Sequence, residues 1–117
     1  MTELARLGAD VTIANNDGDT PVKIASLNGH TDTVTELARL GADVTIADNN
    51  GRTPVWSASL RGHTGTVTEL ARLGADVNIA NNNGRTPVRI ASQNGHTDTV
   101  TELARLGANV HAIEQKG

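Results

Sequence analysis

The sequence predicts an all-α solenoid, in which helix-turn-helix units joined by β-hairpin-like loops stack side by side. The first observation is a unit of 33 residues that occurs three times in succession, as the spacing of Gly18, Gly51 and Gly84 shows. The second is a pair of helical patterns followed by a turn signal in every copy. Because one copy is too short to bury a core of its own, we expect the copies to pack against each other as one domain.

The period divides residues 1–117 into a leading half unit, three full units and a tail. Residues 1–14 match the second half of the unit, the full units span 15–47, 48–80 and 81–113, and residues 114–117 follow. Neither end shows the polar cap that usually closes a repeat array. A fragment of a longer array, an engineered excerpt and a chain that covers its ends by self-association all fit. The near identity of the copies favours a recent duplication or a synthetic origin.

The first helix of each unit begins at a Thr-Pro pair. In the first full unit, Thr20 supplies a hydroxyl N-cap and Pro21 takes the first helical position, where its missing N–H leaves no bond unmade. Gly29 is expected to end this helix. Lys23 and Leu27 are rotated away from the face that we expect to be buried, which holds Val22, Ala25 and Ser26.

The second helix carries the clearer amphipathic pattern. In residues 31–40 the apolar side chains fall in one arc and the polar ones in the other. Asp32 lies near the positive N-terminal end and Arg39 near the negative C-terminal end, while Gly41 stands where glycine commonly ends a helix. We expect the apolar arc to face the core: Val34, Leu37, Ala38 and Leu40.

The segment after this helix predicts a protruding loop. Residues 42–52 alternate small apolar with polar residues and contain Asn50-Gly51, a strong turn signal. Two helices and such a finger, repeated at a constant period, form an L-shaped unit and an elongated, curved array.

These residues resemble the ankyrin repeat, whose pattern runs roughly D-x-x-G-x-T-P-L-H-x-A-A, then G-H, then G-A-D-V-N after an aliphatic helix. The second unit reads DNNGRTPVWSAS at residues 48–59, GH at 62–63 and GADVN at 74–78. The match recurs in register over nearly the whole chain, which makes it far more specific than one copy of the motif. The resemblance implies that fingers and first helices line a concave groove, which in this family usually holds a protein partner.

The copies depart from the family pattern at core positions. The histidine of the family's T-P-L-H is replaced by Lys23, Trp56 and Arg89, and the second alanine by Ser26, Ser59 and Ser92. Trp56 is the only aromatic residue, so burial depends on Val, Leu, Ile and Ala. We expect modest stability.

Composition argues against several classes of function. The net charge of −3 and the pI near 5.7 disfavour a general nucleic-acid binder, which needs clustered positive charge. No apolar run approaches the roughly 18 residues that span a bilayer, so we expect no membrane partner. The chain contains no cysteine, which removes disulfides and cysteine-ligated zinc and suits a cytoplasmic or other intracellular location.

No set of residues points to catalysis, a cofactor or a metal. His30, His63 and His96 recur once per unit, roughly 10 Å apart, whereas zinc needs nitrogens about 2.0–2.1 Å from one ion. A glycine-histidine corner that braces the second helix by hydrogen bonds explains them better. The glutamates recur on one solvated helix face instead of converging in a pocket. We expect a non-catalytic protein with no cofactor and no metal.

The copies differ mainly at the finger tip and on the outward part of the first helix, where the resemblance implies recognition. We expect the partner-binding residues to be Asp19, Lys23, Leu27, Arg52, Trp56, Leu60, Arg61, Arg85, Arg89 and Gln93. Tryptophan is enriched among interface hot spots, so Trp56 is a candidate anchor. An equal alternative is that its ring fills the seam between repeats. Because the arginines lie toward repeats two and three, we expect a partner whose surface is acidic there.

Two functions stay open. The first is a non-catalytic module that binds another protein through the groove. The alternative is a structural or engineered scaffold that forms homo-oligomers through its uncapped ends.

Overall fold

A computed structural model describes residues 12–113 of the chain. Its first helices are α2 (Pro21–Leu27), α4 (Pro54–Leu60) and α6 (Pro87–Gln93). Each is followed by a second helix: α3 (Thr31–Arg39), α5 (Thr64–Arg72) and α7 (Thr97–Arg105). A short 3₁₀ helix, η1 (Val110–Ile113), comes last. Most of the predicted half unit (residues 1–11) and the predicted tail (114–117) lie outside the described residues.

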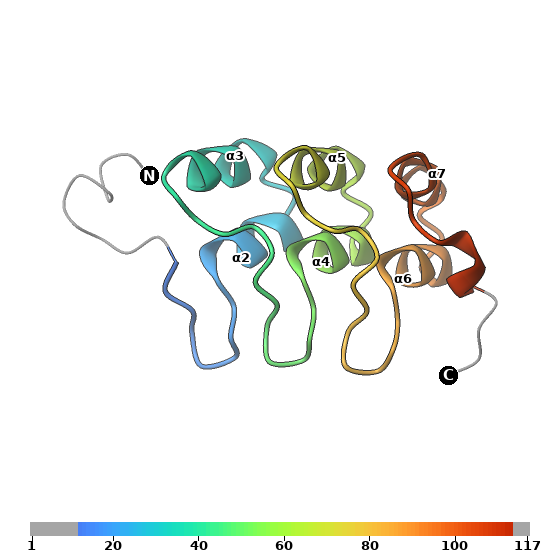
Figure 1. Cartoon of the computed structure of the whole chain (residues 1–117), viewed down its shortest axis with the longest axis horizontal. Coiled ribbons are helices and arrows are strands. Elements are labelled where there is room, and N and C mark those ends of the chain that lie inside the picture. The colour runs from blue at the N-terminus through green and yellow to red at the C-terminus, as the bar shows by residue number, and fades with distance from the viewer. Residues whose placement is uncertain (1–11, 114–117) are drawn as a thin grey trace.

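The helices form two layers (Figure 1). In one row α4 packs between α2 and α6, and in the other α5 packs between α3 and α7. The loops between helix pairs project to the same side, as expected for the fingers. Residues 12–113 contain no strand, so the fingers are turns and not paired ribbons. The predicted all-α solenoid is confirmed.

Local sequence signals set the helix ends. Thr20, Thr53 and Thr86 are N-caps whose Oγ1 atoms accept the backbone N–H three residues on, at 3.1, 3.0 and 3.3 Å. Gly41 follows the C-cap of α3 with a φ of 101°, a conformation that other residues avoid. These signals explain why the helices begin and end where the sequence predicts.

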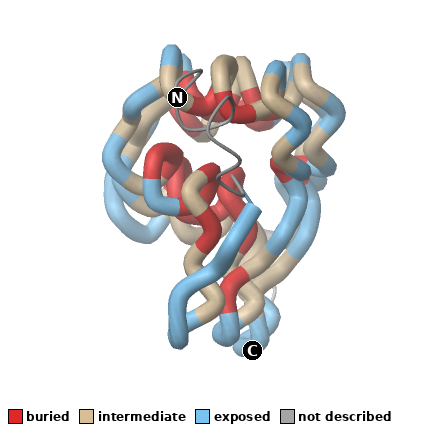
Figure 2. Tube along the Cα trace, turned by 90° about the vertical axis from the view of Figure 1, so that its left-hand side faces the viewer, coloured by how far each residue is buried: buried red, intermediate tan, exposed pale blue. Residues whose placement is uncertain are grey.

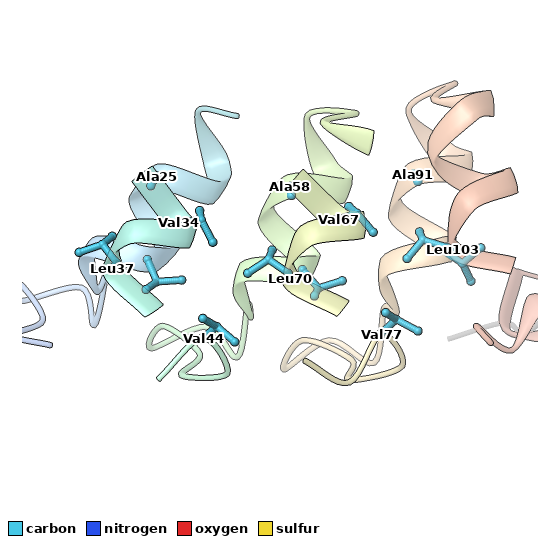
Figure 3. Close-up of a cluster of buried hydrophobic side chains, with 13 residues drawn as sticks. Ala25, Val34, Leu37, Val44, Ala58, Val67, Leu70, Val77, Ala91 and Leu103 are labelled. Atoms are coloured by element: carbon cyan, nitrogen blue, oxygen red, sulfur yellow. The ribbon is translucent and has the colours of Figure 1, made fainter. Parts of the chain in front are cut away.

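The core is a set of small aliphatic side chains that repeats with each helix pair (Figure 3). Val34 and Leu37 of α3 are buried, and their counterparts in the later repeats are buried too, except that Val100 of α7 is only partly buried. Ala38 and Leu40 lie at the edge of this core. Along the array most buried residues lie on the helices, although Val44, Asp48 and Val77 of the loops are buried too, and the finger tips are largely exposed (Figure 2).

Candidate functional site

The first helix of the first repeat sends Lys23 into the finger of the second repeat. Lys23 is only 5 % exposed. Its Nζ lies 3.0 Å from Asp19 Oδ1 and 3.5 Å from Asp48 Oδ2. The outward orientation expected for Lys23 is therefore wrong, because the neighbouring finger covers that side of α2. Burial of the ammonium group is tolerable only because carboxylates face it.

Asp48 is the acceptor at the centre of this seam. Its Oδ1 accepts the backbone N–H groups of Asn50 and Arg52, and its Oδ2 accepts Arg52 Nε–H, each at 2.9 Å. Burial of Asp48 disfavours its charge, but these backbone bonds and the cations Arg52 and Lys23 outweigh burial and lower its pKa. The first and second repeats are thus joined by a buried ionic cluster.

Trp56 crosses the next seam from the equivalent position of α4. The residue is 5 % exposed, and its Nε1 donates to the backbone carbonyl of Arg85, 3.0 Å away. Arg52 Cζ lies 5.9 Å from the ring centroid, within cation–π range. Of the two roles expected for Trp56, the structure favours packing in the seam, since so buried a ring offers a partner little surface.

A pocket of about 380 Å³ lies between the second and third fingers and the first helices. Three predicted site residues line it: Arg52, Trp56 and Arg85. Ile90 of α6 and asparagines of both fingers complete the lining. Two guanidinium groups and one aromatic ring therefore lie in the wall of one pocket.

The other predicted site residues differ in exposure. Arg61 and Gln93 are exposed. Those that are partly buried are Asp19, Leu27, Leu60 and Arg89. None of these residues lines the pocket, so the predicted set covers a surface wider than one site.

Sequence reasoning missed the asparagines that connect the fingers. The backbone N–H of Asn49 donates to the carbonyl of Asp17, and that of Asn82 to the carbonyl of Asn50, at 3.0 and 2.9 Å. The side-chain amides of Asn49 and Asn82 donate to the preceding finger as well. The sequence did contain a signal for these bonds, because asparagine stands at the equivalent position of every copy, as Asn16, Asn49 and Asn82. These bonds keep the finger tips in register.

Charge is divided unevenly between the two layers. In residues 12–113 the finger tips (residues 15–20, 48–53 and 81–86) and the first helices, with their C-caps, carry five cations: Lys23, Arg52, Arg61, Arg85 and Arg89. They carry three carboxylates: Asp17, Asp19 and Asp48. The second helices and the turns after them carry three arginines against seven carboxylates: Asp32, Glu36, Asp43, Glu69, Asp76, Asp98 and Glu102. The finger tips and first helices are thus net positive in a chain whose total charge is −3.

Glu69 and Glu102 of the second helices each accept a hydrogen bond from a threonine of the preceding repeat. Thr35 Oγ1 donates to Glu69 Oε2 at 2.5 Å, and Arg72 Nη2 lies 2.6 Å from the same oxygen. Bonds from Arg72 and Thr35 lower the pKa of Glu69 to about 2. Glu69 therefore stays anionic well into the acid range.

The histidines occupy the corners between the paired helices. His96 is the N-cap of α7, and its Nε2 lies 3.0 Å from the carbonyl of Leu60 in the preceding repeat. The expected brace exists at His96, but it reaches the neighbouring repeat instead of its own second helix. Within residues 12–113, no group of three or more His, Asp or Glu could hold a metal ion. No helix in the same range is long and apolar enough to cross a membrane.

Comparison with known families explains this architecture. A family model described as ankyrin repeats, in three copies, matches residues 1–81 and 40–114. The matched ranges contain all six helices of the paired layers and the fingers around the pocket. A comparison with curated proteins gave no match. Ankyrin repeats are generally protein–protein interaction modules and typically have no enzymatic activity. The chain therefore belongs to the ankyrin-repeat family.

Proposed function

We propose that the chain binds another protein through the concave groove formed by its first helices and fingers. The observation that carries this proposal is the excess of positive charge on the finger tips and first helices, around the pocket of Arg52 and Arg85, whereas the second helices and the turns after them are acidic. The copies also differ in sequence at the finger tips and first helices, whereas the second helices scarcely change. A surface that only supported the fold would have no need of such variation.

The proposed partner is acidic opposite the second and third repeats. Arg61, Arg85, Arg89 and Gln93 belong to these repeats and are exposed or partly exposed. Opposite charge on a partner speeds the encounter and selects one orientation. Trp56 contributes mainly by holding the adjacent fingers at the spacing that the groove needs.

Charge reversal on the two layers tests this proposal. We expect Arg61→Glu combined with Arg85→Glu to weaken binding of a partner isolated with the wild-type chain by about tenfold or more. The matched control is Arg72→Glu with Arg105→Glu, which makes the same change of charge on the second helices. Affinity that falls equally in both variants, or in neither, would contradict binding through the groove.

Self-association through the ends is the second candidate function. Thr64 Oγ1 of α5 lies 2.7 Å from Thr99 Oγ1 of α7, and Thr31 makes the same bond to Thr66. Thr97 holds this position in α7, where it is exposed and has no such partner among the described residues. Light scattering over a concentration series separates the candidates. A mass that rises with concentration supports the scaffold, and a constant monomer mass excludes it.

A further inference from the structure

The first two fingers each contain a side-chain pair between positions four residues apart. In the first finger, Asn15 Nδ2 donates to Asp19 Oδ2 at 3.3 Å. In the second, Arg52 Nε donates to Asp48 Oδ2 at 2.9 Å. Both pairs join a donor to a carboxylate, although the carboxylate stands at the later position in one finger and at the earlier position in the other.

The third finger places two donors at these positions, Asn81 and Arg85. Asn81 Oδ1 accepts the backbone N–H groups of Asn83 and Arg85, at 3.1 and 3.0 Å, just as Asp48 Oδ1 accepts two backbone N–H groups in the second finger. The remaining side-chain atom of Asn81 is therefore Nδ2, which can only donate. The third finger lacks the acceptor that its own geometry requires.

Arg85 is the group left without that acceptor. Its Nε is buried and has no hydrogen-bond partner. Among residues 12–113, no carboxylate lies within ion-pair distance of its guanidinium. Among the described residues no acceptor meets this guanidinium, so an anion that entered the pocket lined by Arg85 would find it unpaired.

The unmatched guanidinium borders the pocket between the second and third fingers. Arg52 lines the same pocket, and although it is paired with Asp48 it adds to the positive potential there. Trp56 and Ile90 supply apolar wall, which strengthens an ionic contact by excluding water. An arginine fork fits a carboxylate by two parallel hydrogen bonds. The site thus has the charge, the donor and the enclosure that a carboxylate needs.

We propose that this pocket binds the carboxylate of an aspartate or glutamate in an acidic segment of the partner, with Arg85 as the recognising group. The inference rests on the proposed function, because it treats the groove as the interaction surface. The partner's carboxylate accepts hydrogen bonds from Arg85, just as the carboxylate of Asp48 accepts one from Arg52 within the second finger. Arg85 is then the residue that places the partner's acidic segment opposite the third repeat.

The test uses the full chain and a hexaglutamate peptide, with hexaglutamine as the neutral control. Trp56 is the only tryptophan of the chain and lines the pocket, so its fluorescence reports binding without a label. We expect the hexaglutamate peptide to bind and to change the emission, and Arg85→Gln to weaken that binding about tenfold. Arg105→Gln removes the same charge from the second helix α7, away from the pocket and the groove, so it should retain nearly the wild-type affinity.

Asn81→Asp is the second variant. It gives the third finger the carboxylate that Asp48 provides in the second, so that Arg85 is paired within the chain and the peptide should lose about as much affinity as with Arg85→Gln. A wild-type chain that binds both peptides equally, or neither, overturns the proposal. Undiminished binding by Asn81→Asp and Arg85→Gln does so as well. Because the peptide assay needs no natural partner, it can fail while the charge-reversal test of the groove succeeds.

Discussion

Trp56 of the second repeat donates its indole N–H to the backbone carbonyl of Arg85 in the third repeat, at 3.0 Å. Lys23 crosses the preceding seam to Asp48 from the equivalent position. The same position of the first helix therefore links the first repeat to the second through an ion pair, and the second to the third through an aromatic ring. Because contacts between neighbours stabilise a repeat array, substitutions in these seams should be the costly ones.

We expect Trp56→Phe to lower the free energy of unfolding by about 1 kcal/mol, since the ring is largely kept and one hydrogen bond is lost. Trp56→Ala should lower it by about 3–5 kcal/mol, because it leaves a cavity in the seam. Urea unfolding followed by circular dichroism measures both changes. The exposed Arg61→Ala is the control and should stay within about 0.5 kcal/mol of wild type. An alanine variant as stable as wild type would contradict the buried position of the ring.

Lys23 and Asp48 should be energetically coupled. Each single substitution, Lys23→Met or Asp48→Asn, leaves a buried charge less well matched, and we expect each to cost about 1–3 kcal/mol. The double variant should cost at least about 1 kcal/mol less than the two single costs together. Asparagine already stands at this finger position in the other two copies, so Asp48→Asn preserves the bonds of the turn. A double-mutant cycle from urea unfolding measures the coupling, and strictly additive costs would refute it.

Acid should weaken the packing of the second helices. Hydrogen bonds from Arg105 and Thr68 lower the pKa of Glu102 from the ordinary 4.5 to about 2 in the folded chain. A carboxylate whose pKa is depressed by folding stabilises the fold above about pH 4.5 and loses that contribution as the pH falls toward 2. We therefore expect the urea midpoint to fall over this interval, and an NMR titration of the glutamate side chains to locate the pKa.

Thr68→Val tests the cause of this shift. Without the hydroxyl donor, the pKa of Glu102 should rise toward 4.5 and the acid dependence should become shallower. Thr101→Val is the matched control. Thr101 holds the same position in α7, but the described residues contain no second helix after α7 that could supply a glutamate to it. The pKa of Glu102 should therefore not change in this variant. A Glu102 pKa that is the same in Thr68→Val and wild type would show that the threonine bond has no part in the shift.

Gly51 and Gly84 share a backbone conformation but differ in their neighbours. Their φ angles are 78° and 79°, so alanine should cost about 1 kcal/mol at either position. A Cβ on Gly51 would lie 2.8 Å from the backbone nitrogen of Asn82, whereas one on Gly84 would meet nothing within 4 Å. We expect Gly51→Ala to lose about 1 kcal/mol or more beyond Gly84→Ala in urea unfolding. Equal losses would indicate that the finger contact contributes nothing to stability.

Much of the fold could be predicted because each repeat carries its own local signals. A Thr-Pro pair, a glycine after the helix and an amphipathic arc each act over a few residues, and three copies in register remove the ambiguity of any one of them. The helices that begin at Pro21, Pro54 and Pro87 confirm these predictions. The family was equally accessible, since its motifs are local as well.

Burial across the seams could not be predicted in the same way. A helical projection treats one helix at a time, so it rotates Lys23 away from the core without showing that the next finger covers it. Ile24 and Ser57 hold the same position of α2 and α4, yet Ile24 is 43 % exposed and Ser57 is 1 % exposed. Their surroundings differ because α4 has a first helix packed on both sides.

The sequence by itself determined the period, the helices with their caps, the small aliphatic core and the family, because these depend on residues within one unit. Only the tertiary structure decided that Lys23 and Trp56 are enclosed, that Asp48 is shared by two cations, and that Arg85 borders a pocket whose described lining contains no carboxylate. The physical reason is that the free energy of a buried charge or ring depends on the groups that stacking brings around it, and most of those groups belong to the next repeat.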